Sequence, residues 1–331
     1  MVRLGFIGCG GIAHAHLAAL DRLRDRAAVV AFFDGNRAQA ADLAGSRKDV
    51  MVTDQVDALW DASLDAVLIT VPNRYHAAYS EDAARRGLAI FCEKPLGVNV
   101  ADATAMAAAV ERASVVNLVG FKNRYFRAIA TLRQVLDHQL LGPVFAYREV
   151  CSGARLANPH IGMEWRMVEA VAGGGAVADF GSHSIDMALW LLTAHTGPLV
   201  SLDSRLATFI ARGDSYPSND DMALLNGRFA GGALFSVLNG RVGPGLYHVE
   251  VYGLKGRALV DMTQPDVLTL VSYGGEKIAA PALPPREFED PLVIQMARFV
   301  EAVATRTPIE PDFATALNVQ RWIEIARNNA H

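Results

Sequence analysis

Apolar residues in the first third of the chain recur in two alternating patterns. Short runs rich in β-branched residues, which are typical of buried strands, are separated by Ala-rich stretches of helical length. The runs predict strands at 3–7, 29–33, 50–53, 66–71, 89–92 and 115–119, and the stretches between them predict helices at 12–23, 37–44, 56–60, 75–86 and 100–112. Asn73 and Asn99 are expected to cap the last two of these helices. The alternation is typical of βαβ units that wind a parallel sheet.

The pattern changes after about residue 120. A helix at 129–138 and a strand at 144–150 precede a loop rich in Gly, Asn and Pro, and a strongly apolar helix is expected at 176–192. Strands follow at 200–211, 221–229, 233–239, 247–253, 258–262 and 267–273, and helices at 292–305 and 313–328 close the chain. Consecutive strands joined by short turns predict a large, open and mostly antiparallel sheet. We therefore expect an α/β protein with a doubly wound parallel domain at 1–122 and a second α/β domain at 123–331.

Length and composition agree with two folded domains. At 331 residues the chain exceeds the size of one hydrophobic core, and a small ligand is expected in a cleft between the domains. Hydrophobic residues make up 51% and charged residues 20%, which excludes a disordered chain. The net charge of −4 and the lack of a basic cluster argue against nucleic acid and membrane as partners. No secretory signal or membrane-spanning run is apparent, so a cytoplasmic protein is expected.

Three cysteines, Cys9, Cys92 and Cys151, are widely separated and form no Cys-x-x-Cys pair. This spacing favours neither a disulfide framework nor a zinc site, and it predicts three small buried residues. A thiol-dependent reaction at Cys151 has weak support because no basic partner is evident beside it.

The first predicted strand is followed by Gly8-Cys9-Gly10-Gly11-Ile12-Ala13, which fits the Gly-x-Gly-x-x-Ala fingerprint of dinucleotide binding. The first glycine permits a tight turn, the second admits a pyrophosphate to the backbone, and Ala13 lets the helix pack closely. The phosphates would then meet the free amides at the helix N-terminus. Asp34 ends the second strand, where a carboxylate can hold ribose hydroxyls and repel the 2′-phosphate of NADP. NAD is therefore favoured, although Arg37 is placed to pair with such a phosphate.

Two further elements have candidate chemistry. Lys94 follows the fifth predicted strand, at the edge of the sheet where open α/β folds bind ligands, and the proline after it favours an extended conformation. The apolar helix at 176–192 has one polar stripe, which consists of Asp179, His183, Asp186 and Trp190. The stripe is either an internal hydrogen-bonded network or the wall of a cavity that holds a polar substrate.

Six motifs run in order through the chain. They are Gly8-x-Gly10-x-x-Ala13, Pro72-Asn73 with His76, Glu93-Lys94-Pro95, Asn123-Arg124-Tyr125, Trp165-Arg166, and Gly173-Gly174-Gly175 followed by Asp179-x-x-x-His183. Together they resemble the Gfo/Idh/MocA oxidoreductases, which include glucose–fructose oxidoreductase, inositol dehydrogenase and rhizopine-catabolism proteins. The resemblance implies a Rossmann domain with NAD, or NADP, as cofactor, and a polyol, sugar or related substrate. It also implies an open second sheet that makes contacts between subunits.

On this basis we expect Lys94, Asp179 and His183 around the reacting hydroxyl. The expected cofactor contacts are Gly8, Gly10, Gly11, Ile12, Asp34, Asn36, Arg37, Val71, Pro72, Asn73, His76, Glu93, Lys94 and Asn123. The expected substrate contacts are Lys94, Arg124, Tyr125, Trp165, Arg166, Asp179 and His183, and the loop at 152–173 is expected to touch the substrate. His183 is the expected general base because the ordinary pKa of histidine lies nearest neutrality, and Lys94 would steady the alkoxide. Asp179 would orient the imidazole or hold a substrate hydroxyl, and Asp186 is expected to be structural.

The leading function is hydride transfer between a nicotinamide and a hydroxyl-bearing carbon of a cyclic polyol, sugar or sugar derivative. A non-catalytic dinucleotide-binding regulator and an NAD-assisted glycosidase of the same fold are the alternatives. A metal hydrolase built on Asp179, His183 and Asp186 has weak support, because three ligands on one helix do not by themselves close a tetrahedral site. The segment 232–238 is apolar on both faces of its predicted strand, which predicts a homodimer or homotetramer.

Overall fold

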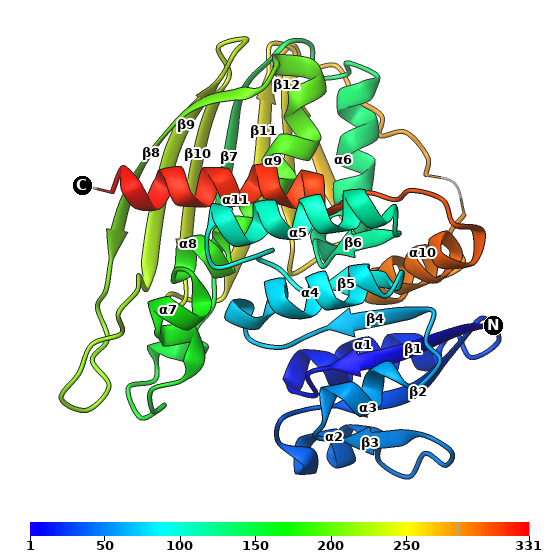
Figure 1. Cartoon of the computed structure of the whole chain (residues 1–331). Helices are drawn as coiled ribbons and strands as arrows, with labels where there is room; N and C mark the ends of the chain where they lie inside the picture. The colour runs from blue at the N-terminus through cyan, green and yellow to red at the C-terminus, as the bar shows by residue number, and fades with distance from the viewer. Residues whose placement is uncertain (284, 331) are drawn as a thin grey trace. The chain divides into compact units, whose positions relative to one another are not determined.

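The computed structural model describes residues 1–283 and 285–330, which fold into two compact units (Figure 1). The first unit comprises residues 1–122 and 287–320, and the second comprises 123–286 and the chain from 321 onward. The first break follows Lys122, as the expected boundary does. Residues 287–320 depart from that expectation because they belong to the first unit.

A six-stranded parallel sheet in the order β3-β2-β1-β4-β5-β6 forms the centre of the first unit. Its strands are β1 (Val2–Ile7), β2 (Ala27–Phe33), β3 (Met51–Thr53), β4 (Ala66–Ile69), β5 (Ala89–Cys92) and β6 (Asn117–Val119). The helices of this unit are α1 (Gly11–Asp21), α2 (Arg37–Ala44), α3 (Val56–Trp60), η1 (Asn73–Tyr75), α4 (His76–Arg85), α5 (Val100–Ala113), α10 (Pro291–Thr305) and the first part of α11 (Phe313–Asn328). The predicted parallel Rossmann sheet is confirmed. The order of the strands in the sheet changes direction between β1 and β4, and folds of this kind bind ligands at that point.

Helix α10 explains why residues 287–320 join the first unit. Its apolar side chains Met296 and Phe299 are buried in the same core as Phe6 and Phe91, and the rings of Phe91 and Phe299 pack edge to face with centroids 5.9 Å apart. Asp290 caps the helix by accepting a hydrogen bond from the first-turn backbone. The apolar face of a helix is visible in a sequence, but the surface that it covers is not.

The second unit contains a seven-stranded sheet in the order β13-β12-β11-β7-β10-β9-β8. The strands are β7 (Val144–Ser152), β8 (Leu199–Ala207), β9 (Met222–Phe229), β10 (Leu234–Gly240), β11 (Leu246–Gly253), β12 (Gly256–Asp261) and β13 (Leu268–Ser272). All neighbours are antiparallel except β7 and β10, so the predicted mostly antiparallel sheet is confirmed.

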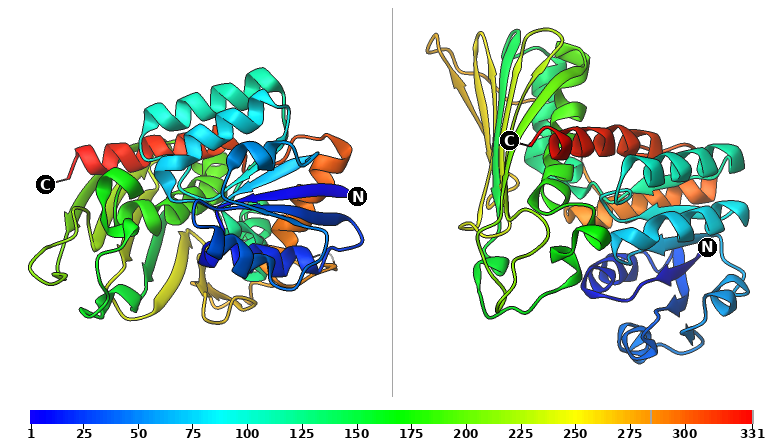
Figure 2. Two further views of the ribbon diagram at one scale, coloured as in Figure 1. Left: turned by 60° about the horizontal axis from the view of Figure 1, so that its bottom comes forward. Right: turned by 60° about the vertical axis from the view of Figure 1, so that its left-hand side comes forward.

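Helices pack on one face of this second sheet, as the right-hand view of Figure 2 shows. The helical elements of the unit are η2 (Lys122–Tyr125), α6 (Arg127–Asp137), η3 (Arg155–Ala157), η4 (Trp165–Met167), α7 (Glu169–Ala172), α8 (Ala176–Asp179) and α9 (Gly181–Thr196). The inner face includes the buried Tyr147, Phe235 and Val249. On the outer face Leu224 and Leu238 remain 37% and 36% exposed. In the described chain no helix is both long and apolar enough to span a bilayer.

Two local predictions are wrong. The helix expected at 176–192 is broken at Phe180 into α8 and α9. Gly181 weakens a continuous helix there and lies close to Asn239, since a Cβ on it would be 3.2 Å from the amide oxygen. The fourth helix begins at His76 rather than beside Asn73, which starts the short η1 turn instead of capping the helix. The Asn99 cap is confirmed, because its side chain accepts from the backbone of Asp102.

Candidate functional site

The glycine-rich turn after β1 has the shape that a dinucleotide requires. Gly8 has φ +93°, and a Cβ there would lie 2.7 Å from the backbone nitrogen of Val71, so only glycine fits. A Cβ on Gly10 or Gly11 would meet nothing within 4 Å, which leaves the backbone open on this side. Helix α1 starts here without a side-chain cap, so its first-turn amides fit a phosphate group.

Asp34 is held rigidly at the end of β2. One carboxylate oxygen accepts from the backbone nitrogen of Cys9 at 2.8 Å, and the other accepts from that of Asn36 at 2.8 Å. Asn36 in turn caps α2, and the exposed Arg37 begins that helix. Each oxygen of Asp34 keeps further acceptor capacity, so the carboxylate is positioned to accept from ribose hydroxyls.

His76 links the loops that follow β4 and β5. Its imidazole is fully buried, with Nε2 3.0 Å from the carbonyl of Val71 and Nδ1 3.1 Å from that of Pro95. Burial lowers the pKa of His76, against the opposing effect of these carbonyls. The imidazole thus links these two loops, and the expected cofactor contact of His76 stays a prediction. Asn73 is also buried, at the start of η1.

Lys94 is connected to the glycine-rich helix through Glu93. The backbone nitrogen of Lys94 donates to the Glu93 carboxylate at 3.2 Å, and the other carboxylate oxygen lies 2.7 Å from Nε2 of His16 on α1. His16 is completely buried and packs edge to face against Phe91. Gly120 lies against the same carboxylate, where a Cβ would come within 2.9 Å of it. Lys94 is half-buried and follows strand β5 at a point where several contacts fix the backbone.

The polar stripe of the second unit is divided by the break at Phe180. Asp186 accepts two hydrogen bonds from Arg124, at 2.9 and 2.5 Å, and both side chains are buried. The Arg124 guanidinium also lies over the Trp190 ring. Asp186, which we expected to be structural, is thus paired with Arg124, and the expected substrate contact of Arg124 stays a prediction. Tyr125 is buried beside it.

Asp179 and His183 lie on either side of the helix break, and both are half-buried. Asp179 ends α8, and His183 lies in the first turn of α9, where its backbone nitrogen donates to the carbonyl of Phe180. The turn before α8 requires glycine at 175, because a Cβ there would lie 1.8 Å from the carbonyl oxygen of Asp220. Gly175 thus helps to set where the helix that contains Asp179 begins.

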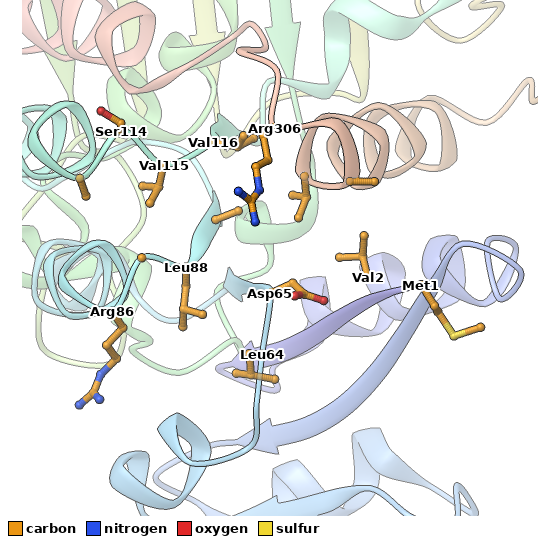
Figure 3. A pocket seen from close by; sticks show the side chains of 15 residues that line it. Met1, Val2, Leu64, Asp65, Arg86, Leu88, Ser114, Val115, Val116 and Arg306 are labelled. Atoms are coloured by element: carbon orange, nitrogen blue, oxygen red, sulfur yellow. The ribbon is translucent and has the colours of Figure 1, made fainter.

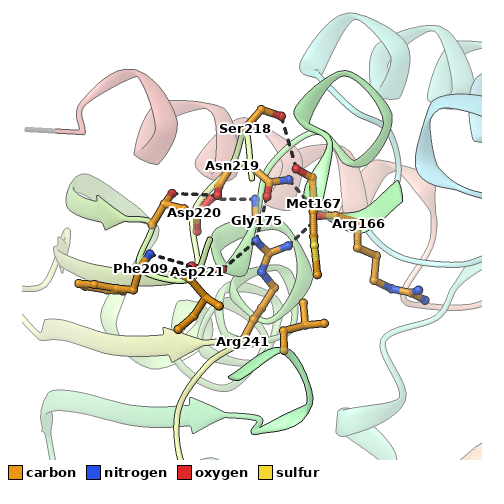
Figure 4. A network of polar contacts seen from close by, with 12 residues as sticks. Arg166, Met167, Gly175, Phe209, Ser218, Asn219, Asp220, Asp221 and Arg241 are labelled. Carbon is orange, nitrogen blue, oxygen red and sulfur yellow. Dashed lines mark hydrogen bonds and ion pairs between the residues drawn. The ribbon is translucent and has the colours of Figure 1, made fainter. Parts of the chain in front are cut away.

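Trp165 and Arg166 lie in the η4 turn, with the guanidinium stacked 4.4 Å from the centroid of the indole. Both side chains are half-buried. The carbonyl of Arg166 accepts from Arg241 at 2.7 Å and from Asn219 at 3.0 Å (Figure 4). Hydrogen bonds from Arg241 and Asn219 therefore fix the backbone of this turn, and the expected substrate contacts of Trp165 and Arg166 stay predictions.

A second buried network lies between β7, β11 and α9. Glu149 accepts from Ser184 at 2.6 Å and from the hydroxyl of Tyr147. Burial raises the pKa of Glu149 to about 7, while hydrogen bonds from Ser184, Tyr147 and Tyr247 act in the opposite direction. Tyr247 also accepts from the buried Asn123 at 2.6 Å. Asn123, expected to contact the cofactor, thus donates to an internal hydroxyl.

A pocket of about 670 Å³ opens at the other edge of the first sheet (Figure 3). Its lining includes Val2 and Asp65 at the amino ends of strands, together with Arg86 and Arg306. Parallel strands place Gly8 and Lys94 at the opposite edge. Because ligands of such folds bind at the carboxyl edge, the size of this pocket does not make it the candidate site.

Other chemistry has little support in the described residues. Cys9, Cys92 and Cys151 are buried, as predicted, and burial raises the pKa of Cys9 to about 12, with Asp34 adding to the effect. Such thiols are poor nucleophiles. In the part of the chain that the structure describes, no three His, Cys, Asp or Glu side chains come together to hold a metal ion.

Several residues of these networks were not expected from the sequence, namely His16, Glu149, Asn219, Asp220 and Arg241. The burial of Glu149 could have been predicted, because it lies on the same face of its strand as Tyr147 and Cys151, two positions from each. The others lie in loops or on helices, where burial depends on distant parts of the chain.

Comparison with known proteins agrees with both halves of the fold. Residues 2–121 match the Gfo/Idh/MocA model described as an oxidoreductase family with an NAD-binding Rossmann fold, and residues 129–259 match a C-terminal domain of the same family. A levoglucosan dehydrogenase of Pseudarthrobacter phenanthrenivorans is 26% identical over 301 residues, which cover 78% of this chain and 76% of that protein. An inositol 2-dehydrogenase of Rhizobium meliloti is 28% identical and covers 83% and 80%.

Solved structures share the whole fold. A levoglucosan dehydrogenase in complex with NADH and levoglucosan has a TM-score of 0.89 at 23% identity, over 99% of this chain and 97% of that one. An oxidoreductase domain protein from Kribbella flavida has a TM-score of 0.88 at 25% identity, over 100% and 97%. With the fingerprint at Gly8–Ala13 and both domain matches, the chain belongs to the Gfo/Idh/MocA family and is an NAD-dependent oxidoreductase.

Proposed function

We propose that this oxidoreductase transfers hydride between NAD and a hydroxyl-bearing carbon of a cyclic polyol, sugar or sugar derivative. The observation that carries the proposal is the His16–Glu93–Lys94 connection, which ties the glycine-rich helix to a half-buried lysine at the same edge of the sheet. Relatives named for levoglucosan and inositol support this class of substrate.

The residues divide the chemistry between them. NAD, bound at the turn after β1, supplies the hydride acceptor. Oxidation of an alcohol also releases a proton, and His183 takes it from the hydroxyl because an imidazole exchanges protons near neutral pH. The Lys94 ammonium donates to the same oxygen and stabilises its developing negative charge. Asp179 orients His183 or binds a neighbouring hydroxyl.

The fixed carboxylate of Asp34 supports a preference for NAD over NADP. Its two oxygens are held by the backbone nitrogens of Cys9 and Asn36, so the negative charge cannot easily turn away from a ribose phosphate. Repulsion of the 2′-phosphate therefore acts against NADP. Arg37 begins the following helix and is exposed to solvent.

We also infer a homo-oligomer that forms through the outer face of the second sheet. Leu224, Leu238 and Val150 are direct cross-strand neighbours on β9, β10 and β7, and they make an apolar row on that face. Leu234 on β10 is 58% exposed. Burial of this row against a second copy would remove apolar surface from water.

A turnover screen tests the proposed function. NAD⁺ and NADP⁺ are offered with inositols, aldoses, anhydrosugars, uronates and amino sugars, and absorbance of the reduced nicotinamide is followed. We expect net reduction of NAD⁺ with at least one member, and a rate about 10²–10⁴-fold lower with the matched Lys94→Met variant. Glycoside cleavage without net reduction would instead support the NAD-assisted glycosidase. Binding of NAD without any turnover would support the regulator.

A further inference from the structure

Arg241 is a buried cation at the end of β10. It is 2% exposed, and its guanidinium donates to the carbonyl of Arg166 at 2.7 Å and to the side-chain oxygen of Asn219 at 2.8 Å (Figure 4). The Asp221 carboxylate lies 3.6 Å away. A buried guanidinium is unfavourable unless its charge and its N–H groups are matched, so these contacts define a specific arrangement.

The partners of Arg241 fix both ends of the segment between η4 and α8. The Asn219 amide donates to the carbonyls of Arg166 and Gly174, at 3.0 and 3.1 Å. The next residue, Asp220, accepts from the backbone nitrogens of Gly175 and Val177, each at 2.8 Å. These contacts set where α8 begins, and Asp179 is its last residue.

Carboxylates balance the buried charge of Arg241. Burial lowers the pKa of Arg241, and Asp220, Asp179, Asp221 and Glu164 act in the opposite direction. These negative charges favour the ionised form of the guanidinium.

We propose that Arg241 is a positioning residue that holds the segment 166–175 in one conformation through its hydrogen bonds to the carbonyl of Arg166 and the side chain of Asn219. The proposal rests on the proposed function, in which Asp179, Trp165 and Arg166 serve the substrate.

Three variants test the hydrogen bonds of Arg241. Arg241→Lys keeps the charge but lacks the planar fork that reaches two acceptors. Arg241→Gln removes the charge. Arg212→Gln is the matched control, because Arg212 is also buried and its guanidinium donates to the carbonyls of Leu156 and Asn158 in the same loop region.

The kcat and KM of each variant are measured with the best substrate of the screen. We expect KM to rise about tenfold in Arg241→Lys and in Arg241→Gln, with kcat changed less than KM, because both lose the paired hydrogen bonds that hold the segment 166–175. Arg212→Gln, whose contacts lie outside that segment, should change KM less. A wild-type KM in Arg241→Lys, or an equal rise of KM in Arg212→Gln, would overturn the proposal.

Hydrogen–deuterium exchange tests the same residue without turnover. In the NAD-free protein, peptides that contain Gly175 and Val177 should exchange faster in Arg241→Lys than in wild type, while peptides of β1 remain unchanged. Equal exchange at 166–178 would overturn the proposal even if a substrate is found. If the screen finds no substrate, the exchange measurement still tests the proposal. If Arg241→Gln does not fold, Asn219→Ser must reproduce the faster exchange and the higher KM, and an unaffected Asn219→Ser would contradict the proposal.

Discussion

Replacement of Glu149 by Gln tests whether a buried proton contributes to the stability of the second domain. Burial raises the pKa of Glu149 from its ordinary value of 4.5 to about 7. Between these values the folded domain retains a proton that the unfolded chain has released. Because the folded state then binds more protons, the free energy of unfolding falls as the pH rises, and the loss is complete above about pH 7. The interval corresponds to a loss of about 3 kcal/mol.

Urea unfolding near pH 4.5 and near pH 8 measures this loss, with the fluorescence of Trp165 and Trp190 as reporters in the second unit. Between the two pH values, wild type should lose about 3 kcal/mol more than Glu149→Gln, because the amide does not titrate. Tyr147→Phe should lose more unfolding free energy than wild type over the same pH interval. The Tyr147 hydroxyl donates to the carboxylate, so its removal raises the pKa of Glu149 further. An equal loss in wild type and Glu149→Gln would refute the reasoning.

Three further outcomes follow from the proposed chemistry and assembly. Lys94→Met and His183→Ala should each lower kcat by about 10²–10⁴-fold while NAD affinity, measured by fluorescence titration, stays nearly unchanged. Near-normal turnover in either variant would remove that residue from the mechanism. Asp34→Ala should weaken NAD binding about tenfold and reduce the discrimination against NADP, whereas a wild-type preference for NADP would show that Arg37 dominates. Leu238→Arg should lower the molar mass measured by light scattering to that of a monomer. A monomeric wild type would contradict the proposed oligomer.

The elements of the fold were predictable wherever the hydrophobic period was strong. Helices α2 and α3 have the expected bounds, and the strands differ by a few residues at their ends. The assignment of α10 was not predictable, because its buried face fits any apolar surface in principle. Only the folded chain shows that Phe299 meets Phe91 about two hundred positions earlier in the sequence.

Residues of the candidate site were predictable where the backbone conformation permits only one residue type. Gly8 needs both a positive φ and the absence of a Cβ, so its pattern is visible in the sequence. Asp186 and Arg124 show the opposite case. A stripe on one helix identifies polar residues but not their partners, and an arginine 62 positions away neutralises the carboxylate.

Buried charges explain most of what the sequence did not reveal. An arginine such as Arg241 is more often solvated, so its position in a loop gives no reason to expect that it is 2% exposed. Its burial is tolerated because Asn219, Asp221 and a backbone carbonyl converge on it from segments that meet only in the fold. The same convergence links the turn at Trp165 to the helix of Asp179. Substitutions at Arg241 should therefore change the conformation of the segment 166–175, although the motifs that identify the family remain intact.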